Sequence, residues 1–224
     1  VIVMPENMAH EKIALIRQFG AEVLLTPAAE GMAGAIRKVE MLKARSENLI
    51  EFKQFENQAN VEAHQLTTSV EIMEDTGGNV DALVCGVGTA GTITGIASAL
   101  KSCIPDLYVL AVEPAESPVL SGGQKGAHRI GGIGAGFVPP LYRPELVDEV
   151  YKVSSKDALD MTKIVAQNEG LPVGVSAAAA LTAAINLAKR DEMAGKNIVV
   201  ILPDSIERYL SDPYFNDEQV ESQD

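Results

Sequence analysis

Short apolar runs alternate with stretches of helical periodicity along most of the chain, and this alternation constrains the fold more than any other feature. The runs expected to form strands occupy residues 1–3, 21–26, 48–52, 82–88, 107–114 and 197–203. Helices are expected before Gly20 and at residues 31–47, 61–75, 91–101, 155–169 and 176–190. Because such alternation is typical of parallel βαβ units, the sequence predicts an α/β fold of parallel twisted sheets flanked by helices. In such folds ligands bind at the carboxyl ends of the strands.

The charge balance and the cysteine content narrow the function classes. The 224 residues include 18 basic and 31 acidic side chains, and the formal net charge is −13. Such a surface repels phosphate backbones, which argues against nucleic acid as a partner. Cys85 and Cys103 form neither a metal-binding spacing nor a disulfide framework, so we expect no metal site and a cytoplasmic location. No apolar run reaches the ~20 residues that span a bilayer, so no membrane partner is expected.

The segment CGVGTAGTITG at residues 85–95 joins an expected strand to an expected helix. Its glycines allow a tight turn that exposes backbone N–H groups, and Thr89 and Thr92 add hydroxyls. The following helix presents the positive end of its dipole to the same place. The segment therefore suits an anion such as a phosphate, without any lysine.

Two other interpretations of this segment remain open at this point, a dinucleotide-binding loop and a purely structural turn. The spacing is not that of a P-loop, but Gly86, Gly88 and Gly91 match a dinucleotide fingerprint, and Glu113 follows at the end of the next strand. Taken alone, the segment is as compatible with a structural turn as with a phosphate site.

Four stretches taken together point to one family. They are EFKQFENQANVEAHQLTT at 51–68, the glycine segment, HRIGGIGAGFVPP at 128–140, and the pair GLPVGVSAAAAL and IVVILPDSIERYLS at 170–181 and 198–211. In these stretches, and in the same order over nearly the whole chain, the sequence resembles the cysteine synthase (O-acetylserine sulfhydrylase) family. These are pyridoxal phosphate-dependent enzymes of fold type II, which resembles the tryptophan synthase β subunit.

The resemblance implies pyridoxal 5′-phosphate as the cofactor. The family's phosphate loop falls on Gly88, Thr89, Ala90, Gly91 and Thr92. The partner of the pyridine nitrogen falls on Ser176, where a hydroxyl leaves that nitrogen largely unprotonated and favours β-elimination. Ser176 is also placed to be the N-cap of a helix. Pro203 matches the wall beside the pyridine ring.

The resemblance also implies the substrate contacts. Gln54 matches the family's residue near the substrate carboxylate. Gly132, Ile133 and Gly134 lie in the loop at 131–137, which matches the segment that lines the substrate mouth. His64 matches a family position on the helix after Gln54, where we expect a structural role.

Some residues depart from the family pattern. Ala90 and Ile206 stand where cysteine synthases usually have glycine, and SAAAA at 176–180 replaces a Ser-Ser-Gly run. The PDSI sequence at 203–206 looks more like cystathionine β-synthase. The Schiff-base lysine of the family has no counterpart in this sequence, since none of the eleven lysines lies in a family-like context, and strand alternation points Lys53 away from Gln54. We therefore expect no catalytic residue in this chain, and expect it to be a C-terminal portion that is incomplete at the N-terminus.

These expectations combine into one prediction. Residues 1–54 are expected to belong to a small, mobile α/β domain, and residues 55–224 to a large C-terminal α/β domain that holds the phosphate loop. The predicted activity is the replacement of the acetate of O-acetylserine by sulfide to give L-cysteine. The resemblance also implies a homodimer and serine acetyltransferase as a partner. The alternatives are a cystathionine β-synthase-like β-replacement enzyme and a non-catalytic binding or regulatory module.

Overall fold

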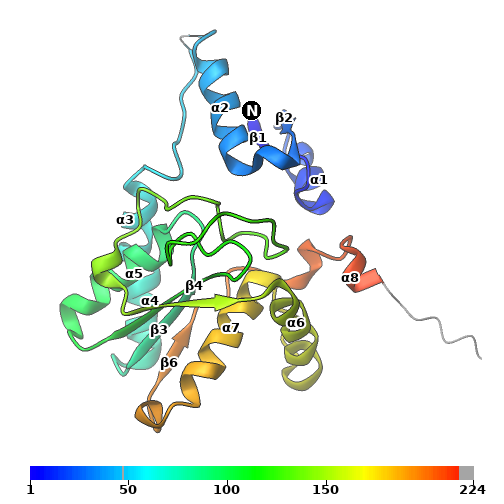
Figure 1. Ribbon diagram of the computed structural model, residues 1–224. Coiled ribbons are helices and arrows are strands. Elements are labelled where there is room, and N and C mark those ends of the chain that lie inside the picture. Colours follow the sequence, from blue (N-terminus) through cyan, green and yellow to red (C-terminus); the bar gives the residue numbers. More distant parts are fainter. Residues whose placement is uncertain (47, 217–224) are drawn as a thin grey trace, which may run out of the picture.

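The computed structural model describes residues 1–46 and 48–216, which fold into two parts of unequal size (Figure 1). The smaller part, here called the small lobe, comprises β1 (Ile2–Pro5), α1 (His10–Gln18), β2 (Val23–Thr26), a short 3-10 turn (Ala28–Glu30) and α2 (Gly31–Lys43). Its two strands pair in parallel, with Ile2 opposite Val23. The sequence pattern strand–helix–strand–helix predicted this arrangement.

The larger part, here called the body, contains a parallel sheet with the strand order β5-β4-β3-β6. Its strands are β3 (Ala82–Gly86), β4 (Tyr108–Pro114), β5 (Glu149–Val153) and β6 (Ile198–Val200). Its helices are α3 (Ala59–Leu66), α4 (Thr68–Thr76), α5 (Gly91–Cys103), α6 (Ser155–Glu169), α7 (Val175–Ala188) and α8 (Pro213–Asn216). Short 3-10 turns occupy Pro144–Leu146, Asp191–Met193 and Ile206–Arg208.

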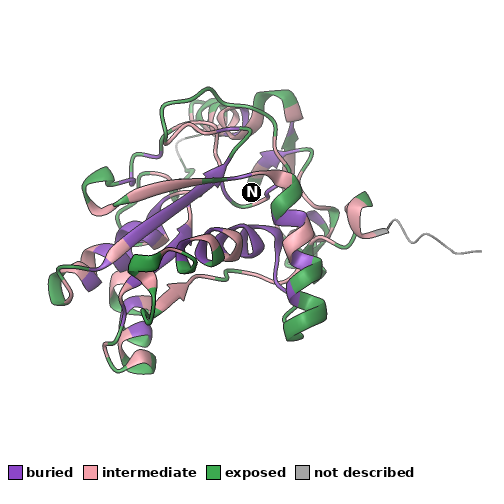
Figure 2. Cartoon of the chain, turned by 60° about the horizontal axis from the view of Figure 1, so that its bottom comes forward, coloured by how far each residue is buried: buried purple, intermediate pink, exposed green. Residues whose placement is uncertain are grey.

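Helices cover both faces of this sheet (Figure 1). Alternate side chains of β3 show the two faces: Leu83 packs with α3, α4 and α5, whereas Val84 packs with α6 and α7. Because β3 and β4 are covered on both faces, they are almost wholly buried, as their purple colour in Figure 2 shows. The alanines of α7 allow its backbone to approach the sheet closely, which brings the start of this helix beside the strand ends.

The ends of α6 follow the sequence signals. Ser154 Oγ accepts a hydrogen bond from the backbone N–H of Asp157 at 3.0 Å, which caps the helix. Gly170 ends the helix with a φ of 68°, a left-handed conformation that glycine adopts without strain.

The structure differs from the sequence prediction in three elements. Residues 48–52 form no strand, and the side chains of Ile50 and Phe52 are exposed. The helix expected at 61–75 is two helices, because the backbone leaves the helical region at Thr67, with φ −122° and ψ −73°. The edge strand β5 was not predicted. The helix expected at 31–47 ends at Lys43, and residue 47 lies outside the described residues.

The predicted domain boundary at residue 54 stays a prediction, although the small lobe and the body have separate sheets. In the described ranges, no helix is both long enough and apolar enough to cross a membrane.

Candidate functional site

The glycine segment lies at the carboxyl end of β3, where the chain enters α5. Ala90 precedes the helix with a φ of 69°, and as the N-cap residue it makes no side-chain hydrogen bond to the first turn. That turn also carries no acidic residue. Its free N–H groups and the helix dipole therefore give this end of the sheet a positive potential, which suits an anion.

Asn60 of α3 fixes the shape of the segment. Its Nδ2 atom donates hydrogen bonds to Thr89 Oγ1 and to the backbone oxygen of Gln54, both at 2.9 Å. Thr89 Oγ1 also accepts from the backbone N–H of Gly91 at 3.3 Å. A Cβ atom on Gly91 would lie 2.1 Å from Asn60 Oδ1, so a larger residue there would displace the Asn60 amide from these contacts. The segment and Gln54 are thus held together through one amide side chain, whereas the side chain of Gln54 itself is exposed.

His64 supports the segment from the next turn of α3. Its Nε2 atom lies 3.1 Å from Thr92 Oγ1, and its Nδ1 atom lies 2.9 Å from Thr68 Oγ1. Partial burial lowers the pKa of His64, which keeps the ring neutral at neutral pH. A neutral imidazole has one donor and one acceptor nitrogen, so it can satisfy both threonine hydroxyls. The contacts agree with the structural role expected for His64.

The loop at 131–137 packs directly against the glycine segment. The backbone N–H of Gly134 donates to the backbone oxygen of Val87 at 3.0 Å. A Cβ on Gly88 would lie 2.4 Å from the backbone oxygen of Gly132. His128 is half-buried, and its Nε2 atom lies 2.9 Å from the backbone oxygen of Gly134, which holds the turn. Two loops that are distant in the sequence therefore form one wall.

Ser176 faces this wall from α7. A Cβ on Gly132 would lie 3.7 Å from Ser176 Oγ, and Ser176 is buried. Its expected role as N-cap is wrong, because Gly174 is the cap and Ser176 is the second residue of the helix. Pro203 is exposed. The next residue, Asp204, lies at the start of α7, where its backbone oxygen accepts a hydrogen bond from the N–H of Gly174 at 2.9 Å.

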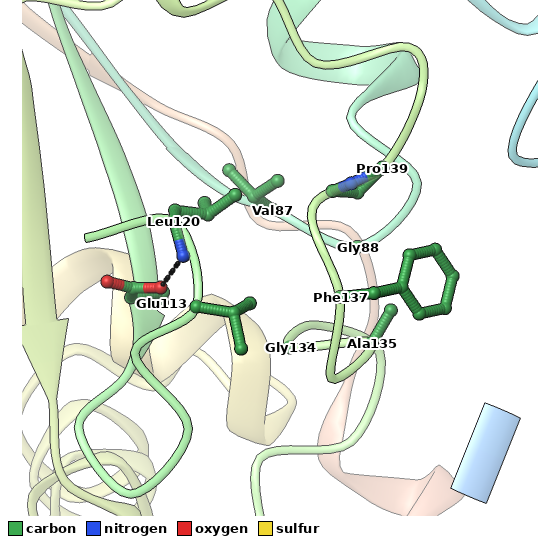
Figure 3. A pocket seen from close by; sticks show the side chains of 9 residues that line it. Val87, Gly88, Glu113, Leu120, Gly134, Ala135, Phe137 and Pro139 are labelled. Carbon is green, nitrogen blue, oxygen red and sulfur yellow. Dashed lines mark hydrogen bonds between the residues drawn. The ribbon is translucent and has the colours of Figure 1, made fainter. Parts of the chain in front are cut away.

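A cavity of about 10 Å³ marks how closely the loops pack (Figure 3). It is lined by Val87, Gly88, Glu113, Val119, Leu120, Gly134, Ala135, Phe137 and Pro139. This volume holds about one water molecule, so the cavity is not itself a cofactor site. Glu113 is buried and accepts hydrogen bonds from the N–H groups of Leu120 and Ser121 at 2.8 and 3.1 Å and from Ser121 Oγ at 2.5 Å. These contacts use both carboxylate oxygens, which argues against Glu113 as the ribose ligand of a dinucleotide.

The described residues bring binding groups together but no reactive side chain. Cys85 is near the segment, but burial raises the pKa of its thiol to about 12, so it is protonated at neutral pH. Lys53 forms an exposed ion pair with Glu56, with 3.0 Å between Nζ and Oε2. Within residues 1–46 and 48–216, no group of three or more His, Cys, Asp or Glu side chains is placed to hold a metal ion.

Sequence reasoning placed Gly88–Thr92, Gly132–Gly134 and Ser176 at one site, and the structure brings these residues together. Sequence reasoning assigned no role to Asn60 or His128, and it considered Glu113 only as a nucleotide ligand. The spacing of Gln54, Asn57 and Asn60 was the one signal for Asn60, since polar residues three apart lie on one side of a turn or helix.

A parallel sheet, a helix that starts at a strand end and two converging glycine loops are typical of α/β proteins that bind an anionic ligand at the carboxyl ends of their strands. Residues 1–204 match the model of the family described as pyridoxal-phosphate dependent enzyme, and the chain belongs to that family. The family membership confirms the predicted cofactor and the predicted fold type II.

The relatives include cysteine synthases. The cysteine synthase of Staphylococcus aureus is 44% identical over 217 residues, which cover 96% of this chain and 69% of the relative. The crystal structure of cysteine synthase from Entamoeba histolytica is 42% identical with a TM-score of 0.89 and covers 96% of this chain and 64% of that one. The structure of an O-acetylserine dependent cystathionine beta-synthase from Helicobacter pylori is 38% identical with a TM-score of 0.89, over 93% of this chain and 68% of that one. The chain thus spans about two thirds of these relatives.

The residues present fit the phosphate group of the cofactor. A side chain at Gly88 would collide with the Gly132 backbone, and one at Gly91 would displace the Asn60 amide that holds Thr89, so glycine at both positions preserves the arrangement of the phosphate donors. The departure at Ala90 does not distort the segment, because Ala90 adopts the left-handed conformation that the turn requires. Ile206 has no positive φ, so glycine is not required there.

Proposed function

We propose that the full-length protein to which these residues belong is a cysteine synthase, which replaces the acetate of O-acetylserine by sulfide and releases L-cysteine and acetate. The observation that carries the proposal is the convergence of the glycine segment, the 131–137 loop and Ser176 at the carboxyl end of β3, in a chain 44% identical to a cysteine synthase.

The glycine segment is proposed to hold the cofactor phosphate. The backbone N–H groups at the start of α5 and the hydroxyls of Thr89 and Thr92 are the donors, and Gly88 and Gly91 allow the close approach. The Ala90 methyl is directed into the core, where Ala90 packs with the residues of α3 and α5, so it leaves the donors accessible. His64 and Asn60 orient the two threonines from behind.

Ser176 is proposed to donate a hydrogen bond from its hydroxyl to the pyridine nitrogen, with Pro203 beside the ring. When bound, pyridoxal phosphate supplies the electron-withdrawing ring that allows an amino-acid substrate to lose its β-substituent. A hydroxyl at Ser176, unlike a carboxylate, does not hold a proton on that nitrogen, which limits carbanion stabilisation and favours elimination and replacement at Cβ.

Gln54, Gly132, Ile133 and Gly134 are proposed to bind the substrate. Gln54 lies next to the glycine segment, because the same Asn60 amide donates to the backbone oxygen of Gln54 and to Thr89. Gly132 is exposed beside Ser176. We propose that the Schiff-base lysine is none of the lysines in residues 1–224 and belongs to another part of the full-length protein. A homodimer and an association with serine acetyltransferase are proposed from the family resemblance, and a cytoplasmic location from the cysteine content.

One observation favours a second candidate, a cystathionine β-synthase-like enzyme that also uses β-replacement. The PDSI sequence at 203–206 lies beside the start of α7, and the similar Helicobacter pylori structure is named an O-acetylserine dependent cystathionine beta-synthase. The two candidates differ in the nucleophile, sulfide or homocysteine, and the second can also use serine in place of O-acetylserine.

The test uses the full-length protein with pyridoxal phosphate. L-cysteine formation is measured with O-acetylserine and sulfide, and cystathionine formation with O-acetylserine or serine and homocysteine. Faster cysteine formation supports the proposal, and faster cystathionine formation supports the second candidate. A protein that binds the cofactor but forms neither product would be a non-catalytic module.

A further inference from the structure

The segment that follows β6 connects three regions that are otherwise separate. Residues 204–212, here called the strap, run past the start of α7 toward the small lobe (Figure 1). The strap is joined to the body by backbone hydrogen bonds, in which Gly174 N donates to Asp204 O at 2.9 Å and Ile206 N donates to Pro172 O at 2.8 Å.

Tyr209 joins the strap to the loop that lines the site. Its hydroxyl donates to Asp204 Oδ2 at 2.6 Å. Burial, and then the hydrogen bond to Asp204, raise the pKa of Tyr209, so the hydroxyl stays protonated and keeps donating. Cβ atoms on Gly131 and Gly174 would lie 3.3 and 3.1 Å from the Tyr209 ring, so the ring fills the space between the loop and the start of α7.

An ion pair makes a second connection to the same loop. Arg129 binds Asp212 at the end of the strap. Ile130, the next residue, is fully buried and leads directly into Gly131 and Gly132. The loop is therefore held to the strap on both sides of Ile130.

The same end of the strap also binds the small lobe. The backbone N–H and the hydroxyl of Ser211 donate to Glu11 Oε1 and Oε2 of α1, both at 2.6 Å. The hydrogen bond from the Ser211 hydroxyl lowers the pKa of Glu11, so the carboxylate is ionised at neutral pH. Apart from bonds made by the connecting residues 44–58, this pair provides the only hydrogen bonds between the small lobe and the body in the part of the chain that the structure describes.

We propose that the strap couples the position of the small lobe to the loop at 131–137: Ser211 holds Glu11 of the small lobe, while Tyr209 and Asp212 hold the start of the loop. Both contacts belong to one short segment, and the loop contacts the glycine segment through Gly134 and Val87. A change in the position of α1 is therefore transmitted to the wall of the site. Such coupling is reciprocal, so a ligand that orders the loop also strengthens the Glu11–Ser211 contact.

Hydrogen exchange in the full-length protein tests the coupling without any substrate. Glu11→Gln removes the charge that Ser211 binds, and Ser211→Ala removes one of the two donors. Glu6→Gln is the matched control, because Glu6 Oε1 also accepts from a backbone N–H, that of Ala28 at 3.1 Å, but within the small lobe. Exchange is followed by mass spectrometry in peptides that cover residues 129–137 and, as an internal reference, β4.

Both test variants are expected to speed exchange in 129–137 by roughly two- to tenfold, the range that the loss of one hydrogen bond produces. Exchange in β4 and in the Glu6→Gln variant is expected to match the wild type. Unchanged exchange in 129–137 in both test variants, or an equal rise in Glu6→Gln, would overturn the coupling.

A second readout rests on the proposed function. In cysteine synthesis, loss of the coupling raises KM for O-acetylserine more than it lowers kcat, because the loop is expected to close on the substrate. If the full-length protein forms no cysteine, the exchange result still decides the coupling, since the exchange needs neither substrate nor turnover. If the protein is active and exchange rises while KM stays unchanged, the strap does not act on substrate binding, and this part of the inference fails.

Discussion

The contact between Gly88 and Gly132 leads to the sharpest prediction about the site. In Gly88→Ala the new Cβ would lie 2.4 Å from the backbone oxygen of Gly132, whereas real Cβ atoms essentially never approach closer than 3.0 Å. The two loops must therefore separate by about 0.6 Å. The obstacle is a backbone atom, so no side-chain rotation relieves it, and the adjacent hydrogen bond from Gly134 N to Val87 O lengthens from 3.0 Å.

Two effects are expected from this separation. The free energy of unfolding falls by about 1–3 kcal/mol, as in other overpacked sites. The N–H groups of the glycine segment also move off the phosphate, and the loss of one hydrogen bond to a charged group costs about 1.5–3 kcal/mol. The dissociation constant for pyridoxal phosphate should rise roughly 10- to 100-fold, since 1.4 kcal/mol corresponds to a factor of ten.

The assay is a titration of the full-length apoprotein with pyridoxal phosphate, followed by absorbance or fluorescence, together with urea unfolding. Gly77→Ala is the control, because Gly77 has a φ of 59° at the end of α4 and nothing within 4 Å of an added Cβ. It should lose about 1 kcal/mol of stability through backbone strain, with no change in cofactor affinity. If Gly88→Ala binds the cofactor within twofold of the wild type, the loop contact does not position the phosphate donors and the reasoning is wrong.

Three further predictions concern single side chains. Ala90→Gly should change the free energy of unfolding by less than ~1 kcal/mol, because relief of the left-handed strain offsets the lost methyl, whereas Ala90→Val should lower it by at least ~2 kcal/mol in urea unfolding. Because burial lowers the pKa of His64 in the folded state, its contribution to stability should be complete above the ordinary histidine pKa of about 6.5 and decline as the pH falls below that value. The melting temperature of His64→Gln should therefore depend less steeply on pH than that of the wild type between pH 7 and 5. An identical slope in the two proteins would contradict this. Tyr209→Phe should lower the free energy of unfolding by about 1–3 kcal/mol, because Asp204 Oδ2 loses its donor while Oδ1 is already buried without one; a wild-type unfolding curve would show that this hydrogen bond contributes nothing.

The strands show how far the sequence predicts the fold. The buried strands β3 and β4 were predicted because buried parallel strands are continuous apolar runs. The edge strand β5 was missed because Glu149 and Lys152 interrupt its pattern, which only an edge position tolerates. The opposite error occurred at residues 48–52, where an apolar run has no strand to pair with among the described residues, and Ile50 is 90% exposed. Local pattern predicts the propensity to form a strand but not the presence of a neighbour.

The candidate site shows a similar limit. The glycine segment was recognisable from its composition and from the family resemblance. The contacts that give the segment its shape come from Asn60 and His64, which lie 29 and 28 residues from the threonines they bind. These contacts depend on the packing of α3 against α5 and on the Gly95 backbone, where a Cβ would lie 2.5 Å from the oxygen of Val61. Spacing within one element could not predict a contact between two helices.

The geometry of the segment also decides which departures from the family pattern matter. A Cβ on Gly88 would meet the backbone oxygen of Gly132, and a Cβ on Gly91 would meet the Asn60 amide that holds Thr89. Substitution at either glycine therefore disturbs the proposed phosphate donors directly. Ala90 lies between them, but its methyl is 3% exposed and packs in the core shared by α3, α5 and the sheet. Its cost is backbone strain of about 1–2 kcal/mol, which burial of the methyl partly offsets. An alanine at position 90 therefore affects stability rather than the anion site, so it does not by itself favour a non-catalytic module.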